Sequence, residues 1–169
     1  MKLTKLEEQG MRLAMCLARA RGQMTLLELS CLEGMTEALA AKVLGRLRAG
    51  GIVSALRGRH GGYALARPPT ELTVCTVLRS LGRPLVDGCF TGSPGQRQDP
   101  CPHVDACGIR PVWEFIGARI EQVLDQMTLA DLLEREEHIR ARLTSLDRAS
   151  GRTAASRYTT PSTCSPRHE

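Results

Sequence analysis

The chain has 169 residues, of which 42% are hydrophobic and only 3% are aromatic, and its formal net charge is +5. This length suits one domain, or one small domain with an appendage, around an aliphatic core. We find no run of eighteen apolar residues, and no apolar N-terminal stretch followed by a cleavage site. These features argue against a membrane span and a secretory signal, so we expect a cytoplasmic protein whose thiols stay reduced.

Positive charge is concentrated in the N-terminal part of the chain. Residues 1–67 hold eleven Lys or Arg side chains against five Asp or Glu side chains. This asymmetry favours a polyanionic partner for the first sixty-odd residues. The sequence shows no catalytic constellation, no phosphate-binding loop and only scattered histidines, so we do not expect an enzyme.

The N-terminal part predicts three helices. Apolar residues recur at helical spacing over residues 3–20. Thr25, with Glu28 three residues later, predicts a capping box at the start of a second helix that stops near Gly34. A third helix, capped by Thr36, is predicted over residues 36–48. Two short helices joined by a tight Gly-containing turn indicate a helix-turn-helix.

A β-hairpin is predicted directly after these helices. Residues 52–56 alternate as a strand, residues 57–62 form a basic, Gly-rich turn, and residues 63–66 return. A helix-turn-helix followed by a hairpin is the winged-helix arrangement. The predicted fold class is therefore mainly α with a small β-hairpin wing.

The second half of the chain predicts a loop between helices. A short helix over residues 72–81 leads into the loop, and Pro111 begins a helix of some seventeen residues. Its apolar face is wide, which predicts packing against a second copy of the chain. A more charged helix is expected over residues 129–146. The predicted organisation is a DNA-binding domain (1–82), a cysteine-rich loop (83–110), a dimerisation and C-terminal helix region (111–146) and a disordered tail (147–169).

Three of the seven cysteines, Cys89, Cys101 and Cys107, fall within nineteen residues that show no helical or strand period. Their number is odd, so an internal disulfide would leave one thiol over. Metal or cluster ligation is the leading interpretation. A zinc site that includes His103 and a simple thiol switch remain the alternatives. Cys16, Cys31 and Cys75 lie within predicted helices and are expected to be core thiols.

The segment Arg57-Gly-Arg-His-Gly-Gly-Tyr-Ala-Leu-Ala-Arg67 resembles the wing of the Rrf family of winged-helix regulators, in particular its iron–sulfur members of the IscR and NsrR type. The opening Met-Lys-Leu-Thr, residues 46–53, the cysteine triplet and residues 127–133 fit the same family in the same order. The resemblance covers about residues 1–133.

This resemblance implies a homodimer that places one winged helix on each half-site of a palindromic DNA operator. It also implies an iron–sulfur cluster, [2Fe–2S] or [4Fe–4S], bound by Cys89, Cys101 and Cys107. In NsrR-like members an acidic residue from the partner subunit completes the cluster, and the matching residue here is Glu8. We therefore expect a DNA-binding repressor whose affinity is set by a cluster that responds to nitric oxide, redox state or cluster supply.

DNA contacts are predicted on the third helix and at the wing tip, where N-terminal helix residues reach base edges and basic residues reach phosphates. The candidates are Thr36, Glu37, Ala38, Ala41, Lys42, Arg46, Arg57, Arg59 and His60. Two alternatives remain: a regulator of this family with a thiol switch or zinc and no cluster, and a small iron–sulfur carrier that does not bind DNA.

Overall fold

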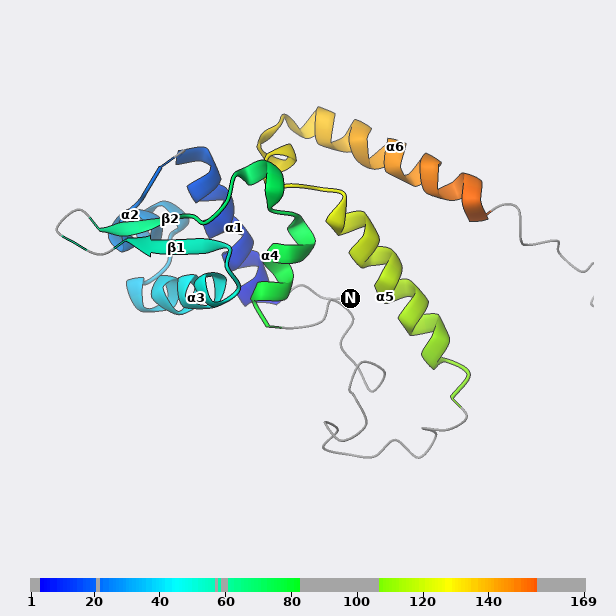
Figure 1. Ribbon diagram of the computed structural model, residues 1–169, viewed down its shortest axis with the longest axis horizontal. Helices are drawn as coiled ribbons and strands as arrows, with labels where there is room; N and C mark the ends of the chain where they lie inside the picture. Colours follow the sequence, from blue (N-terminus) through cyan, green and yellow to red (C-terminus); the bar gives the residue numbers. More distant parts are fainter. Residues whose placement is uncertain (1–3, 21, 57, 59–60, 83–106, 155–169) are drawn as a thin grey trace, which may run out of the picture. The chain divides into compact units, whose positions relative to one another are not determined.

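A computed structural model describes residues 4–20, 22–56, 58, 61–82 and 107–154. The chain divides into two compact units, Met1–Glu134 and Arg135–Glu169, and each is considered by itself. The elements of the first unit are α1 (Lys5–Ala20), α2 (Leu26–Glu33), α3 (Glu37–Ala49), β1 (Val53–Leu56), β2 (Gly62–Leu65), α4 (Val74–Ser80) and α5 (Arg110–Asp125), with short 3₁₀ turns η1 (Pro69–Glu71) and η2 (Asp131–Leu133) (Figure 1). The second unit contains α6 (Glu136–Ala154).

The core of the first unit lies where α1, α3 and α4 meet. Its members are aliphatic, as the composition predicts, and large ones with no exposed surface are Leu13, Leu29, Leu44, Leu47, Ile52, Leu72 and Leu129. They come from helices, a loop and the segment after α5, so distant parts of the sequence share one core. Burial of these side chains is the main stabilising term for such a unit.

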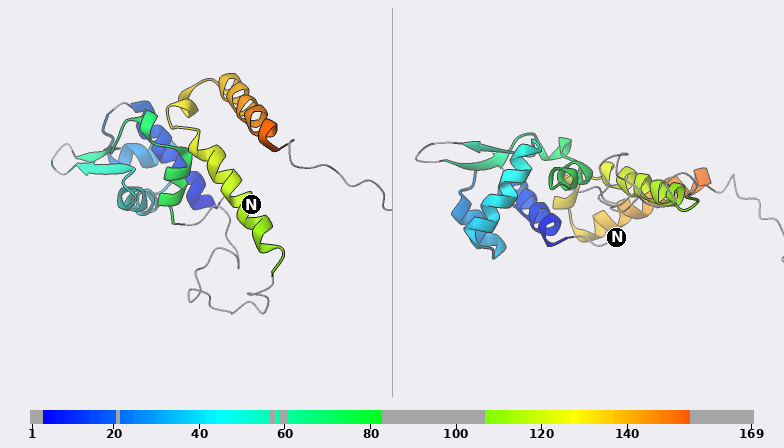
Figure 2. Two further views of the ribbon diagram at one scale, coloured as in Figure 1. Left: turned by 45° about the vertical axis from the view of Figure 1, so that its right-hand side comes forward. Right: turned by 90° about the horizontal axis from the view of Figure 1, so that it is seen from below.

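The wing is a two-stranded antiparallel sheet in which Val53 pairs with Leu65 and Leu56 pairs with Gly62. Tyr63 also exchanges two backbone hydrogen bonds with Met24, of 2.9 and 2.7 Å, just before α2. Gly62 permits this approach, because a Cβ atom there would lie 2.5 Å from the Met24 carbonyl oxygen. Near its turn end, β2 is therefore joined to the segment just before α2. Figure 2 shows the two strands beside the helices from two further directions.

The segment after α5 returns to the start of α4. Val74 donates its backbone N–H to the Met127 carbonyl, and Leu129 donates to the Leu72 carbonyl, each at 2.8 Å. These bonds hold Thr128 extended against Thr73 as an isolated β-bridge. The predicted helix over residues 129–146 is therefore wrong at its beginning, because the backbone there already pairs with the segment before α4.

The last helix also begins and ends later than predicted. The turn η2 closes at Glu134, which is extended (ψ 168°), and α6 then runs from Glu136 to Ala154. Helix thus continues eight residues past the predicted boundary at 146, and residues 155–169 of the predicted tail lie outside the described residues. Within the described ranges, no helix is long and apolar enough to cross a membrane.

Candidate nucleic-acid interface and cysteine site

The helix-turn-helix is fixed by local capping, as the sequence predicts. The Thr25 hydroxyl accepts the Glu28 backbone N–H at 3.2 Å, and the Glu28 carboxylate accepts the Thr25 N–H at 2.7 Å. The hydrogen bonds from Thr25 lower the pKa of Glu28. The helix α2 ends at Gly34, and Thr36 caps α3 by accepting the Leu39 N–H at 3.3 Å. Two residues, Gly34 and Met35, therefore separate the last residue of α2 from the cap of α3.

The recognition-helix candidate α3 has one buried face and one exposed face. The buried face consists of Ala40, Val43, Leu44 and Leu47. Predicted DNA-contact residues Thr36, Glu37, Ala38, Lys42 and Arg46 are exposed, and Ala41 is partly exposed. The structure thus brings these residues of the predicted interface onto the face of α3 that does not form core. The wing-tip candidates Arg57, Arg59 and His60 lie outside the described residues.

Arg46 makes a contact that the sequence did not predict. Its Nη1 donates a hydrogen bond of 2.7 Å to the Leu81 carbonyl oxygen at the end of α4. A predicted DNA contact is therefore also a contact between the recognition helix and the helix that precedes the cysteine loop. Nothing in the spacing of Arg46 and Leu81 signals this pairing, because it depends on how α3 and α4 pack.

Among the predicted cluster ligands in the loop, the structure describes Cys107. This residue is partly exposed and lies just before α5, with its carbonyl accepting the Arg110 N–H at 3.3 Å. Cys89 and Cys101 lie outside the described residues. Within the parts of the chain that are described, no three His, Cys, Asp or Glu side chains gather as a metal-binding group.

The remaining predicted ligand, Glu8, lies on the exposed side of α1. Its side chain is 64% exposed and forms an ion pair of 4.0 Å with Arg12. Arg12 Nε also donates a 2.7 Å hydrogen bond to the Glu33 carboxylate, and its Nη2 reaches the Glu33 carbonyl at 3.2 Å. Arg12 therefore links the candidate ligand to the end of α2, a connection that sequence spacing did not indicate.

The other described cysteines do not share one environment. Cys75 is fully buried, as expected. Its pKa is raised to about 11, mainly by burial and to a smaller extent by the nearby Asp125 carboxylate. Cys16 is partly buried, and burial with the neighbouring Glu33 raises its pKa. Cys31 is exposed on α2, so the prediction of a core thiol is wrong there. The reason is that the described core contacts of α2 run through Leu29 and Ser30.

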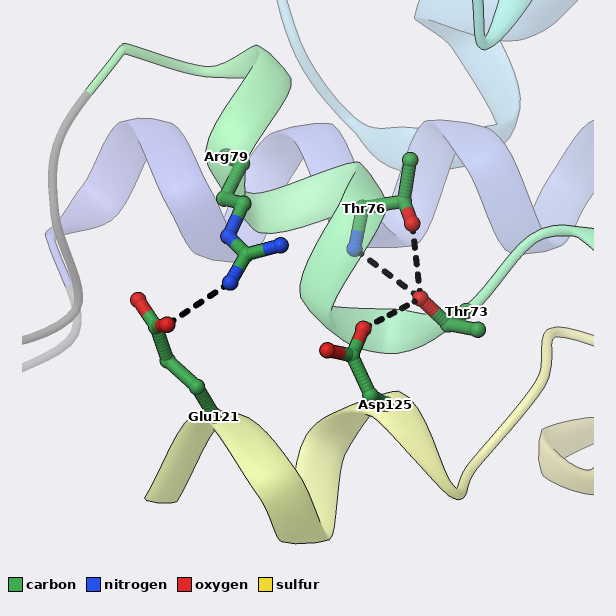
Figure 3. A network of polar contacts seen from close by, with 5 residues as sticks. All are labelled: Thr73, Thr76, Arg79, Glu121 and Asp125. Carbon is green, nitrogen blue, oxygen red and sulfur yellow. Dashed lines mark hydrogen bonds and ion pairs between the residues drawn. The ribbon is translucent and has the colours of Figure 1, made fainter. Parts of the chain in front are cut away.

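A polar network joins α4 to α5 (Figure 3). Thr73 caps α4 by accepting the Thr76 N–H at 3.1 Å, and its hydroxyl donates to Asp125 at 3.0 Å. Arg79 forms an ion pair of 2.7 Å with Glu121, which raises the pKa of Arg79. These contacts attach the helix after the cysteine loop to the helix before it.

Comparisons with known proteins agree with this geometry. Residues 3–135 match the Rrf2 family, described as an iron-dependent transcriptional regulator. The HTH-type transcriptional regulator IscR of Sodalis glossinidius is 29% identical over 125 residues, which are 74% of this chain and 73% of the relative. An rrf2-like HTH-type regulator of Rhodobacter capsulatus is 30% identical over 111 residues, 65% of this chain and 74% of that protein.

Solved structures give the same result. The structure of T. potens IscR matches with a TM-score of 0.59 and 27% identity, and the match covers 79% of this chain and 86% of that one. CymR of B. subtilis, described as a global cysteine regulator, matches with a TM-score of 0.59 and 25% identity over 78% of this chain and 95% of that one. The winged-helix prediction is confirmed. Because the family match extends over residues 3–135, the chain belongs to the Rrf2 family of transcriptional regulators.

Proposed function

We propose that this Rrf2-family regulator is a homodimeric repressor whose affinity for a palindromic operator is controlled by an iron–sulfur cluster. Cys89, Cys101 and Cys107 of one protomer would bind the cluster, and Glu8 of the second protomer would complete it. The observation that carries the proposal is the partial exposure of Cys107 at the beginning of α5, in a family described as iron-dependent. Membership in a family of regulators does not support the alternative of a carrier without DNA binding.

DNA binding is assigned to the exposed face of α3. In the proposed complex the N-terminal residues Thr36, Glu37 and Ala38 lie nearest the base edges, with Ala41 one turn further along the helix. The side chains of Thr36, Ala38 and Ala41 are short, which suits close approach of the helix to the groove floor. Lys42 is exposed on the same helix and would bind a phosphate. The wing-tip residues Arg57, Arg59 and His60 would reach phosphates or the adjacent minor groove.

Dimerisation is assigned to α5. Within the described parts of the chain, none of its residues is buried, although its sequence is rich in large apolar side chains. Phe115 is 71% exposed and Val112 is 51% exposed. Exposed apolar faces of this kind mark protein interfaces, and a second α5 has a matching surface. A dimer would also supply the second DNA-binding unit that a palindromic operator requires.

The two proposed ligands that the structure describes, Cys107 and Glu8, carry donor groups that fit an iron site. Cys107 offers a thiolate, a soft ligand that iron accepts, and Glu8 offers an exposed carboxylate. Glu8 must leave its ion pair with Arg12 to bind iron, and this pair is exposed and therefore weak. When bound, such a cluster supplies a centre that reacts with small oxidants or nitric oxide. Loss of the Glu8 ligand would then release the two protomers from one shared site.

The test is anaerobic purification followed by the visible absorption spectrum, with iron, sulfide and zinc assays on the same sample. We expect charge-transfer bands and matching iron and sulfide, lost in Cys107→Ala and retained in Cys31→Ala. The Cys31 variant is the matched control because it removes another accessible thiol outside the loop. A protein that stays colourless after anaerobic reconstitution with iron and sulfide would contradict the cluster proposal.

A regulator with a thiol switch or zinc is the second candidate, favoured by the likeness to CymR, whose description refers to cysteine. A colourless protein with stoichiometric zinc, or one whose DNA affinity changes with the oxidation of Cys107, would support it. In either case the assignment of DNA binding to α3 stands and is tested separately by weaker and less salt-dependent operator binding in Lys42→Met.

A further inference from the structure

The C-terminal end of α4 is the place where three helices meet. Leu81, only 1% exposed, packs against α1 at Gly10, where a Cβ atom would lie 2.5 Å from Leu81 Cδ1. The end of α3 approaches equally closely, because a Cβ atom on Gly50 would lie 2.2 Å from Ser80 Cβ. The last turn of α4 is therefore held between the first helix and the recognition helix.

Arg46 adds a polar contact to this close packing. The Leu81 carbonyl is at the C-cap of α4, where carbonyl oxygens lack partners within the helix. Arg46 Nη1 donates to this oxygen at 2.7 Å, so a cation lies at the negative end of the α4 dipole. The next residue, Gly82, has a φ of +100°, and a Cβ atom there would lie 3.4 Å from Arg46 Nη1. The chain thus leaves α4 directly beside the Arg46 guanidinium.

We propose that Arg46 is a positioning residue, which binds the recognition helix α3 to the end of α4 and does not itself bind the DNA backbone. Because the chain continues at residue 83 into the segment with the three cysteines, Arg46 would connect α3 to that segment. The inference deepens the proposed function and rests on it, since it assumes that α3 reads DNA. It differs from the sequence prediction that Arg46 is a DNA contact.

The two roles differ in how salt affects operator binding. Each phosphate contact releases counterions, so its loss lowers the slope of log affinity against log salt by about 0.9. Loss of a positioning residue weakens binding without changing the number of phosphates neutralised, and the slope stays as it was. The salt slope therefore distinguishes the two roles where affinity alone does not.

The experiment compares Arg46→Met with the unaltered full-length protein, with Lys42→Met as the matched control. Lys42 lies one turn earlier on α3, is exposed, and its replacement removes the same charge. The probe is a short duplex that the unaltered protein selects from a random pool. We expect Arg46→Met to weaken binding about three- to tenfold with an unchanged slope, and Lys42→Met to lower the slope by about one.

Hydrogen exchange of the DNA-free proteins supplies the structural readout. The amides of Leu81 and Gly82 donate to Leu78 and Arg79 within the last turn of α4, each at 3.1 Å. We expect both to exchange faster in Arg46→Met and as in the unaltered protein in Lys42→Met. Support for the inference requires faster exchange together with an unchanged salt slope.

Either of two results overturns the inference. The first is a fall of about one in the salt slope of Arg46→Met, whatever the exchange shows. The second is unchanged exchange at Leu81 and Gly82, whatever the affinity does. If the unaltered protein selects no duplex, the proposed function fails instead, and the exchange measurement alone decides whether Arg46 holds the end of α4.

Discussion

The helices α1, α3 and α4 differ from α5 in what their apolar faces contact. Leu13, Leu44 and Leu78 are buried in the core, whereas α5 has no buried residue among the described parts of the chain. All of these helices have an apolar face in the sequence. Helical periodicity therefore predicts that a helix has an apolar face. It does not predict whether that face is buried against other helices of the same chain.

The contacts between helices follow the same division. At the end of α4, Leu81 enters a space beside Gly10 of α1, which is close apolar packing. Between α4 and α5 the contacts include Arg79 with Glu121 and Thr73 with Asp125, which are partly exposed polar pairs. Exposed ion pairs stabilise little, so α5 is attached to its own chain by weaker contacts than α4 is.

Removal of a core side chain should give the largest effect. Leu44 is fully buried, and Leu44→Ala should lower the free energy of unfolding by about 2–5 kcal/mol, because it removes apolar contacts and leaves a cavity. Urea unfolding followed by circular dichroism measures this. Val112→Ala on the exposed face of α5 is the control at low protein concentration, and an equal loss of stability there would contradict the contrast between the two regions.

Thiol reactivity should follow the same contrast. Cys75 is buried with a pKa of about 11, whereas Cys107 is partly exposed at the start of α5. Below the ordinary thiol pKa of 9.0, Cys75 stays protonated and inaccessible, so we expect iodoacetamide to modify the metal-free Cys107 at least about a hundredfold faster. Peptide mass spectrometry over time measures both rates.

The raised pKa of Cys75 has a further consequence for stability. The folded protein disfavours the Cys75 thiolate. Titration of Cys75 should therefore leave the free energy of unfolding unchanged below pH 9.0 and should lower it as the pH rises from 9.0 toward about 11. For the labelling experiment, similar rates of modification at Cys75 and Cys107 in the folded protein would contradict the contrast between a buried and an accessible thiol.

A charge on the exposed face of α5 should break the proposed dimer. Phe115→Glu places a carboxylate where a second copy of α5 would bury the ring. We therefore expect the dissociation constant of the dimer to rise at least about thirtyfold. Sedimentation velocity over a range of protein concentrations measures this. Gln122→Glu adds the same charge to another exposed position of α5 and should raise the dissociation constant far less. A monomeric unaltered protein would remove the dimer from the proposal.

Replacement of the glycine at the C-cap of α3 tests the close approach of α3 to α4. Gly50→Ala should lower the free energy of unfolding by about 1–3 kcal/mol, because its Cβ atom would overlap Ser80. Gly45→Ala is the matched control, since a Cβ atom there would meet no other part of the protein within 4 Å beyond the neighbouring backbone of α3, and α3 should gain up to about 1 kcal/mol in helix propensity. Thermal unfolding measures both, and equal changes would argue against tight packing at Gly50.

The smallest effect is expected at the ion pair between α4 and α5. Glu121→Gln should lower the free energy of unfolding by less than about 1 kcal/mol, because the Arg79 side chain is half exposed to water. Repeating the urea unfolding at high salt should abolish the difference between variant and unaltered protein. A loss as large as that of Leu44→Ala would mean that α5 is part of the core after all.

Local features of the fold could be predicted from the sequence. The Thr25 and Glu28 capping box and the Thr36 cap are confirmed, because each depends on residues three positions apart. The helix predicted over residues 129–146 is wrong at its start, because the hydrogen bonds of Val74 and Leu129 depend on a long-range return of the chain. The spacing of residues along the sequence does not reveal such long-range backbone pairing.

The candidate site shows the same limit. The exposure of Lys42 and Arg46 on α3 follows from helical periodicity and matches the structure. The additional bond from Arg46 to Leu81 and the exposure of Cys31 depend on how the helices pack, and could not be predicted. The roles of Cys89, Cys101 and the wing tip stay predictions, because these residues lie outside the described parts of the chain.

The bridge between Thr73 and Thr128 pairs the two ends of the stretch that contains α4 and α5. The stretch that contains α4 and α5 begins and ends at this bridge, so backbone hydrogen bonds hold its two ends together whatever its length. A doubling in the length of a flexible connection costs only about 0.6 kcal/mol in closure entropy. A longer or shorter connection between α4 and α5 would leave the pairing of Thr73 with Thr128 in place.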